Sequence, residues 1–297
     1  MRSSNPVFSR RGFSRDNGYA GFNAQQPQAG GPAAGANPYA TNPYATNPYA
    51  TDPYAQGAPQ GAPAQAPARP GAMTIDDVVS RTAMTLGTVF VTAVLAWFLL
   101  PVDPANLGTS YGIGIGAALV AFVFAMIQSF KRKASPALIL LYAAFEGVFL
   151  GVISSAVSTY VSPGVVPQAV LGTMAVFAGV LIAYKMRWIR VTRRFYGFVM
   201  AAALGFVLLM AVNLLFAVFG GGDGLGFRSG GLGILFGVIG IILGACFLAL
   251  DFKQVEDGVT YGAPREESWL AAFGLTMTLV WIYLEFLRLL SILQGDD

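Results

Sequence analysis

Long apolar runs recur along the chain from residue 83 onward, and they set the interpretation of the whole sequence. Each run approaches or exceeds the ~20 residues that a helix needs to cross a ~30 Å hydrocarbon layer. The runs cover residues 83–100, 111–130, 137–161, 165–184, 195–220, 231–252 and 268–293. Because lipid offers the backbone no hydrogen-bond partners, such runs form helices. The pattern therefore predicts an all-α polytopic membrane protein with seven transmembrane helices.

The chain changes character near residue 75. Residues 1–74 are rich in Ala, Gly, Pro, Gln and Asn, and they contain the repeat Asn37-Pro-Tyr-Ala-Thr41, which recurs twice and ends in the variant Asp52-Pro-Tyr-Ala55. Such a segment cannot bury enough apolar surface to offset its ordering entropy. We expect a disordered tail at residues 1–74, acting as a spacer or as a row of weak docking sites, and a membrane domain at residues 75–297.

Basic residues divide the connections between the runs into two classes. The connections after the second, fourth and sixth runs hold Lys131, Arg132, Lys133, Lys185, Arg187, Arg190, Arg193, Arg194, Lys253 and Arg265, whereas the other three hold Arg228 alone. Lys and Arg mark the cytoplasmic side of a membrane protein. We therefore expect a multi-pass protein of the cell membrane, with the amino-terminal tail in the cytoplasm and the short carboxyl terminus, residues 294–297, outside.

Composition narrows the chemistry. Hydrophobic residues make up 55% of the chain and charged residues 11%, against about 25% charged in soluble proteins. The net charge of +3 is too small and too scattered to indicate nucleic-acid binding. The chain has no His, and its one cysteine, Cys246, lies in an apolar run, so His-based catalysis, His metal sites and disulfides are excluded. We expect no enzyme activity.

Glycines at i, i+4 spacing indicate where helices approach closely. They form the pairs Gly147/Gly151, Gly233/Gly237 and Gly240/Gly244. Small residues at this spacing let the backbones of two membrane helices come together. We expect these faces to pack against other helices.

Four ionisable residues fall inside the runs, where a central charge costs about 2.5–3.5 kcal/mol on insertion. They are Glu146, Asp251, Glu285 and Arg288. Intramembrane charges usually face a bundle interior or a wet cavity and are functional by default. Each also has a structural alternative. Arg288 could reach the outer interface, or pair with Glu285 one turn away on the same helix. Asp251 could be an interfacial residue, and Glu146 a hydrogen-bonded core acid.

The depth of these residues indicates a route. Asp251 should lie near the inner mouth, Glu146 further out, and Glu285 beside Asn213 in the outer half. Carboxylate and amide oxygens suit hard cations such as calcium, and we expect Asp251 and Glu146 as the metal-contacting acids. Removal of a carboxyl from water favours its neutral form, so such a route would respond to pH.

Several segments of the membrane domain resemble the Bax inhibitor-1/YccA-like family, also named the transmembrane Bax inhibitor motif family. The matching segments are Tyr142-Ala-Ala-Phe-Glu-Gly147 with Gly151, Asn213-Leu-Leu-Phe216, Leu250-Asp-Phe-Lys-Gln254, Tyr283-Leu-Glu-Phe286, Arg288-Leu-Leu-Ser-Ile-Leu293 and the terminal Asp296-Asp297. The resemblance covers about residues 75–297. It implies a seven-helix fold with the last helix central, surrounded by the other six.

The resemblance also implies a cation leak, especially of calcium, that is gated by the protonation of two aspartates. It implies no cofactor, with calcium or protons as the transported or gating ions. Asp251 matches the first aspartate. Aligning Tyr283-Leu-Glu-Phe286 puts Glu285 at the second, whereas counting back from Arg288 puts Thr278 there. Depth favours Thr278, since the partner of Asp251 should lie about ten residues into the last run. Gating should then be weaker or shifted.

Two other functions stay open. Family members are associated with restraining membrane proteases and stress pathways, so the chain could be a membrane-embedded regulator that binds a membrane protease or another membrane protein without transport. A proton-coupled transporter is a further alternative, although no inverted repeat is evident. An intramembrane aspartyl hydrolase is disfavoured, because Asp251 and Glu285 should lie at different depths.

Overall fold

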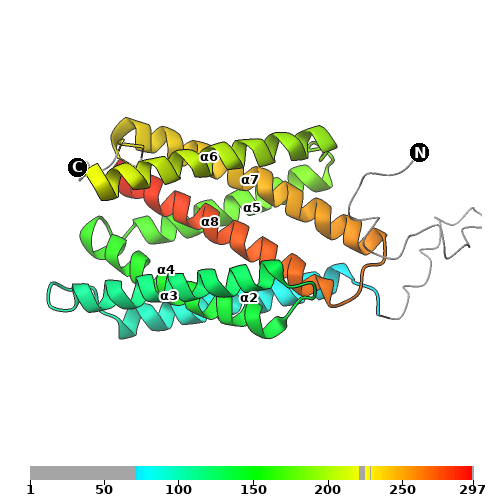
Figure 1. Cartoon of the computed structure of the whole chain (residues 1–297), viewed down its shortest axis with the longest axis horizontal. Helices are drawn as coiled ribbons and strands as arrows, with labels where there is room; N and C mark the ends of the chain where they lie inside the picture. Colours follow the sequence, from blue (N-terminus) through cyan, green and yellow to red (C-terminus); the bar gives the residue numbers. More distant parts are fainter. Residues whose placement is uncertain (1–70, 221–224, 228, 296–297) are drawn as a thin grey trace, which may run out of the picture. The chain divides into compact units, whose positions relative to one another are not determined.

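Seven helices account for most of the chain in a computed structural model, which describes residues 71–220, 225–227 and 229–295. The helices are α2 (Ile75–Leu99), α3 (Leu107–Phe130), α4 (Pro136–Tyr160), α5 (Val165–Lys185), α6 (Arg193–Gly220), α7 (Gly230–Thr260) and α8 (Glu267–Gly295). Each is long and apolar enough to cross a membrane. The prediction of an all-α protein with seven transmembrane helices is therefore confirmed (Figure 1). Residues 1–70 of the predicted tail and residues 221–224 of the connection between α6 and α7 lie outside the described residues.

Two helices extend well beyond the apolar runs that predict them. α2 begins at Ile75 because Thr74 and Asp77 form a capping box, with the Asp77 amide donating to Thr74 Oγ1 at 3.1 Å. α7 continues to Thr260 through polar turns in which Lys253 pairs with Asp257 at 2.8 Å. Caps and i, i+4 ion pairs stabilise the polar turns of a helix that extend beyond its apolar run. Hydropathy does not predict these turns, because their residues are polar.

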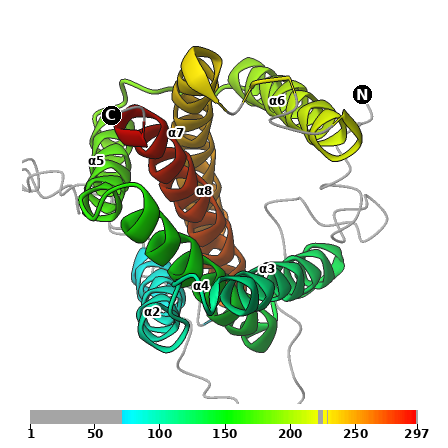
Figure 2. The same cartoon turned by 90° about the vertical axis from the view of Figure 1, so that its left-hand side faces the viewer.

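The last helix is the centre of the bundle, as the family resemblance implies. α8 packs directly on α2, α4, α5 and α7, and it has the largest buried share of the seven helices. α3 packs on α4, and α6 packs on α7. Seen from one end, α8 crosses between these groups (Figure 2). The two outer helices reach α8 through side chains, as in the contact between Phe206 of α6 and Trp281, whose ring centroids lie 5.7 Å apart.

Glycines bring the packed helices together at the predicted faces. A Cβ atom at Gly151 of α4 would lie 2.8 Å from the Ala96 Cβ of α2. On α7, a Cβ at Gly244 or Gly237 would lie 2.5 Å from Ile282 or 3.2 Å from Leu289 of α8. Each glycine therefore makes room for the facing helix.

The residues just before α2 are fastened to the connection between α7 and α8. The Met73 amide donates to the Ala263 carbonyl at 2.8 Å, and the Arg265 amide donates to the Gly71 carbonyl at 2.9 Å. Residues 71–73 and 263–265 together are named the inner clasp. Met73 is buried, so residues that precede Ile75 are also part of the packed bundle.

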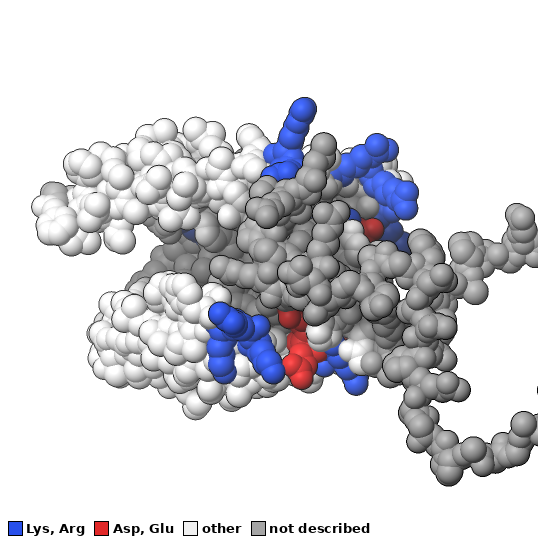
Figure 3. Space-filling model, turned by 45° about the vertical axis from the view of Figure 1, so that its right-hand side comes forward, with Lys and Arg blue, Asp and Glu red and all other residues white. Residues whose placement is uncertain are grey.

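Charge is distributed unevenly between the two ends of the bundle. The described basic residues of the connections lie at the end where α2 and α8 begin, and the opposite end is uncharged on the face in view (Figure 3). Arg228 lies outside the described residues. We call the basic end of the bundle the inner end and the opposite end the outer end.

Close packing at Gly151 can be tested against a glycine that has open space beside it. Gly151→Ala should lower the free energy of unfolding by about 1–3 kcal/mol, because its methyl group overlaps Ala96. Gly116→Ala on α3 is the matched control: its Cβ meets nothing within 4 Å, so it should be neutral or stabilise the helix by up to about 1 kcal/mol. Thermal unfolding of both variants in detergent measures the difference, and equal effects would contradict the packing assignment.

Candidate functional site

One stripe of α8 carries polar residues at helical spacing. It consists of Gly274, Thr278, Trp281, Glu285 and Arg288, and it is named the polar stripe. Residues three and four apart lie on one face of a helix. This face is turned toward α7 and α6. The other sides of α8 are packed mainly with buried apolar residues, apart from the hydrogen bonds of Thr276 to Thr85 and of Tyr283 to Ser154. The polar stripe therefore contains or contacts most of the candidate site residues.

Asp251 of α7 meets the inner part of the polar stripe. The Thr278 hydroxyl donates a hydrogen bond of 2.7 Å to Asp251 Oδ2. Gly274 leaves space beside the same carboxyl, because a Cβ there would lie 3.4 Å from Oδ1. Thr278 thus stands opposite Asp251, as the depth argument expects. Glu285 lies two turns further out, about 10 Å along the helix axis.

Glu285 and Arg288 form an ion pair within the polar stripe. Arg288 Nη2 contacts Glu285 Oε2, and each side chain is 12% exposed. Arg288 therefore does not extend to the outer interface, which was one of its expected alternatives. Its Nε and Nη1 atoms are buried and have no hydrogen-bond partner in the described part of the chain. The pair is a sequestered charge centre rather than a surface contact.

Gly240 of α7 accommodates the carboxyl of this ion pair. A Cβ atom at Gly240 would lie 2.8 Å from the Glu285 carboxyl carbon. The Trp281 indole N–H donates to the Gly240 carbonyl at 3.3 Å, one turn inward of Glu285. The sequence pattern marked Gly240 as a packing residue, but not as the residue that makes space for an acid. The position of Gly240 beside Glu285 depends on the register between α7 and α8, which the sequence pattern does not specify.

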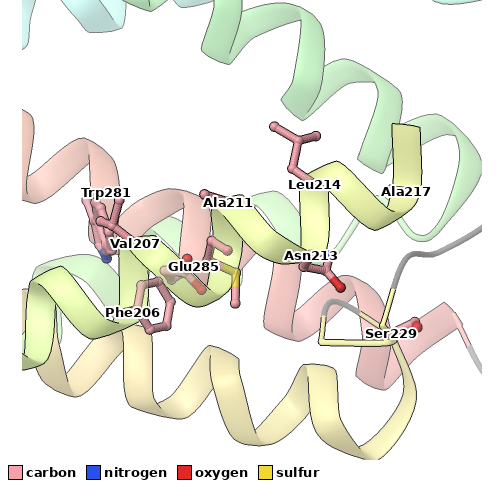
Figure 4. A pocket seen from close by; sticks show the side chains of 10 residues that line it. Phe206, Val207, Ala211, Asn213, Leu214, Ala217, Ser229, Trp281 and Glu285 are labelled. Carbon is pink, nitrogen blue, oxygen red and sulfur yellow. The ribbon is translucent and has the colours of Figure 1, made fainter. Parts of the chain in front are cut away.

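Glu285 and Asn213 line one pocket, as their similar depth predicted. The pocket has a volume of about 660 Å³ and lies between α6, the start of α7 and α8 (Figure 4). Its lining is otherwise mainly apolar, with Phe206 and Trp281 at the end where Glu285 lies. Asn213 Oδ1 accepts a hydrogen bond from the Leu225 amide at 2.9 Å. Asn213 thus holds the connection between α6 and α7 at the wall of the pocket.

Glu146 lies on the side of α4 that faces α8. Tyr142, one turn inward, makes an edge-to-face contact with Phe273 at a centroid distance of 5.1 Å. Leu150, one turn outward, lies in a cluster with Val280. The Glu146 side chain is half-buried and forms no hydrogen bond or ion pair with a described residue. It is an intramembrane acid without a partner among these residues.

The depth expected for Glu146 needs correction. It lies one turn outward of the Tyr142–Phe273 contact, and Thr278 on α8 lies a little more than one turn outward of Phe273. Glu146 is therefore about level with Asp251 instead of between Asp251 and Glu285, and the two acids approach α8 from different helices, α4 and α7. Among the described residues, no group of three or more acids, His or Cys could hold a metal ion. Metal contact by Asp251 and Glu146 stays a prediction.

The buried ion pair can be tested by removing its members separately and together. Arg288→Met leaves the Glu285 carboxyl buried without a counter-charge, so we expect the free energy of unfolding to fall by about 3–5 kcal/mol. Adding Glu285→Gln should recover part of this loss, since a neutral amide needs no counter-charge. Unfolding in detergent measures both effects. Lys253→Met is the control, because it breaks a more exposed ion pair at the end of α7, and its effect should be much smaller.

Comparison with known proteins identifies a family that the chain matches. The family model described as Bax inhibitor 1 like matches residues 5–295. The match reaches far into the segment that precedes the bundle, whereas the sequence resemblance was based on residues from about 75 onward. No curated protein matches the chain. The seven membrane helices, the central last helix and the extent of the match lead to one conclusion: the chain belongs to the Bax inhibitor-1-like family.

Proposed function

We propose that this multi-pass membrane protein is a pH-sensitive cation leak channel with calcium as its principal ion. The observation that carries the proposal is the polar stripe, which places two oxygen-bearing side chains, Thr278 and Glu285, at successive depths along the central helix. Asp251 and Thr278 form the inner station, and Glu285 with Asn213 forms the outer one. Calcium prefers oxygen ligands of this kind and tolerates irregular geometry.

The inner station is the proposed gate. The Thr278 hydroxyl donates to the Asp251 carboxylate, and this bond joins α7 to α8 at 2.7 Å. A hydrogen bond to an ionised acceptor is stronger than one between neutral groups. Protonation of Asp251 would weaken the bond between the two helices and would also remove the negative charge that attracts a cation. The family resemblance implies a second acid opposite Asp251, and Thr278 takes that place.

The outer station is the proposed barrier. At rest Arg288 neutralises Glu285, and its fixed positive charge opposes a passing cation. The neighbouring pocket gives the Glu285 carboxyl space to turn away from Arg288 toward Asn213. Glu146, which has no partner among the described residues, supplies a further acid at the depth of the gate. The basic end of the bundle is proposed to face the cytoplasm.

The gate is tested in vesicles loaded with a calcium-sensitive dye. Asp251→Asn stays neutral at every pH, so its calcium flux should lose its pH dependence and remain at the level that the unchanged protein reaches in acid. Asp257→Asn is the matched control, because this acid lies six residues further along α7 in an ion pair with Lys253. An Asp251→Asn variant with an unchanged pH profile, or an unchanged protein without flux at any pH, would overturn the proposal.

A second variant tests the partner position. Thr278→Asp puts an acid opposite Asp251, and two neighbouring carboxyls titrate as a coupled pair. The flux should then change over a wider pH range, in two steps, than in the unchanged protein. Thr278→Val keeps the shape but removes the hydroxyl donor, so the response should flatten. Identical profiles for both variants would show that position 278 does not contribute to gating.

A regulatory binding function is the second candidate, with a membrane protease or another membrane protein as partner. Two observations favour it: the family match begins at residue 5, and the chain enters the bundle at the inner clasp. Deleting residues 1–70 keeps the clasp and the helix cap intact. Under this alternative, affinity purification from the protein's own membranes should lose the partner complex on deletion, while calcium flux in vesicles stays unchanged. A complex that survives the deletion counts against a role for this segment.

A further inference from the structure

A second pocket lies at the basic end of the bundle, away from the polar stripe. It has a volume of about 600 Å³ and is formed by the end of α5, the connection to α6 and the last turns of α7. Its lining residues are Tyr184, Lys185, Arg187, Ile189, Arg190, Val191, Lys253 and Glu256. We name it the inner basic pocket. Neither the family match nor the proposed leak function assigns it a role.

The acid in this pocket is already paired. Glu256 accepts hydrogen bonds from Tyr184 and from Lys253, the latter at 3.3 Å. Lys253 also forms an ion pair with Asp257 at 2.8 Å, so its charge is neutralised on α7 itself. These contacts leave no free acid in the lining.

Three of the four lining cations have no such partner. Lys185, Arg187 and Arg190 form no ion pair or hydrogen bond through their side chains with described residues, although the charge of Arg187 acts on Glu256 across the pocket. The pocket therefore carries a surplus of positive charge that converges on one hollow. Convergent cations of this kind attract an anion.

The backbone at Arg187 has a conformation that is uncommon for arginine. Arg187 has a φ of 60°, the left-handed conformation in which glycine is favoured. It ends α5 in a Schellman motif, with the Arg187 amide donating to Tyr184 at 3.0 Å and the Trp188 amide donating to Ala183 at 2.9 Å. Glycine is the usual residue at this position of a helix end, so arginine here carries a backbone cost that glycine would not.

The segment around Arg187 has the character of a membrane interface. Trp188 is 73% exposed and Met186 is 54% exposed, and both lie between basic residues. Tryptophan prefers the headgroup level of a bilayer, where its ring is apolar and its N–H is hydrated. The inner basic pocket therefore lies at the depth of lipid phosphates.

We propose that the inner basic pocket binds a phosphate-bearing anion, with the headgroup of an acidic phospholipid as the favoured source. Arg187 and Arg190 carry guanidinium groups that can bind phosphate oxygens in pairs, and Lys185 adds a point charge. Basic pockets at the cytoplasmic ends of membrane helices recognise acidic headgroups in this way. The bound phosphate would join the end of α5 to the connection that leads to α6. This inference does not depend on calcium transport.

Native mass spectrometry of the full chain in detergent tests the proposal with dioctanoyl phosphatidylglycerol as the probe. Dioctanoyl phosphatidylcholine is the zwitterionic comparison. Combined Lys185→Gln, Arg187→Gln and Arg190→Gln changes should weaken phosphatidylglycerol binding by about tenfold or more. The matched control combines Lys131→Gln, Arg132→Gln and Lys133→Gln, which removes the same charge from the exposed connection between α3 and α4 and should leave binding within about twofold.

Competition separates the two sources of phosphate. Displacement of the probe by glycerol phosphate or inorganic phosphate at similar concentration would assign the site to a soluble phosphate compound. Displacement only by acidic lipids would assign it to a headgroup. Equal losses in the two triple variants, or equal binding of phosphatidylcholine, would overturn the proposal, because either result reduces the effect to general charge or to acyl-chain binding.

A single variant separates binding from folding. Arg187→Gly removes the guanidinium and also relieves the left-handed backbone at this position. Its melting temperature should therefore equal or exceed that of the unchanged protein, while its affinity for phosphatidylglycerol falls severalfold. A more stable variant with unchanged affinity would show that Arg187 does not contact the anion.

Discussion

Polar groups at membrane depth are stabilised chiefly by partners inside the protein, because lipid supplies none. This constraint explains why two of the four intramembrane charges, Glu285 and Arg288, lie on the central helix. Thr278 of α8 satisfies Asp251 of α7, and Arg288 neutralises Glu285 within α8 itself. A helix at the edge of the bundle could not hold such groups without exposing them to acyl chains. Because α8 is central, the surrounding helices shield its charged side chains from lipid.

The glycines of α7 make this arrangement possible. Gly237, Gly240 and Gly244 bring the α7 backbone against α8, and the space they leave is filled alternately by apolar and charged side chains. Gly244 receives Ile282, while Gly240 receives the carboxyl of Glu285. The same i, i+4 spacing of glycines on α7 therefore makes space for an apolar side chain at one turn and for an acidic side chain at the next. A sequence pattern that indicates close approach does not by itself tell these two uses apart.

The sequence predicted the number, order and type of the helices because the transfer of apolar runs into lipid dominates the energetics. It also predicted that Thr278 faces Asp251, since depth along a helix follows from residue number. It could not place Glu146, because the offset between α4 and α8 depends on the tertiary contact of Tyr142 with Phe273. The inner basic pocket was equally out of reach. Its cations were visible in the sequence, but their convergence depends on where α5 ends and how α7 passes it.

The inner clasp limits how the central helix can move. Two backbone hydrogen bonds link the chain before α2 to the connection before α8, so α2 and α8 are joined at one end. Axial sliding of α8 would have to break both bonds, whereas a swing of its far end would not. A helix that is fixed at one end in this way can tilt about that end more easily than it can slide along its axis. Such a tilt displaces the outer turns, where Glu285 and Arg288 lie, more than the inner turns that carry Thr278.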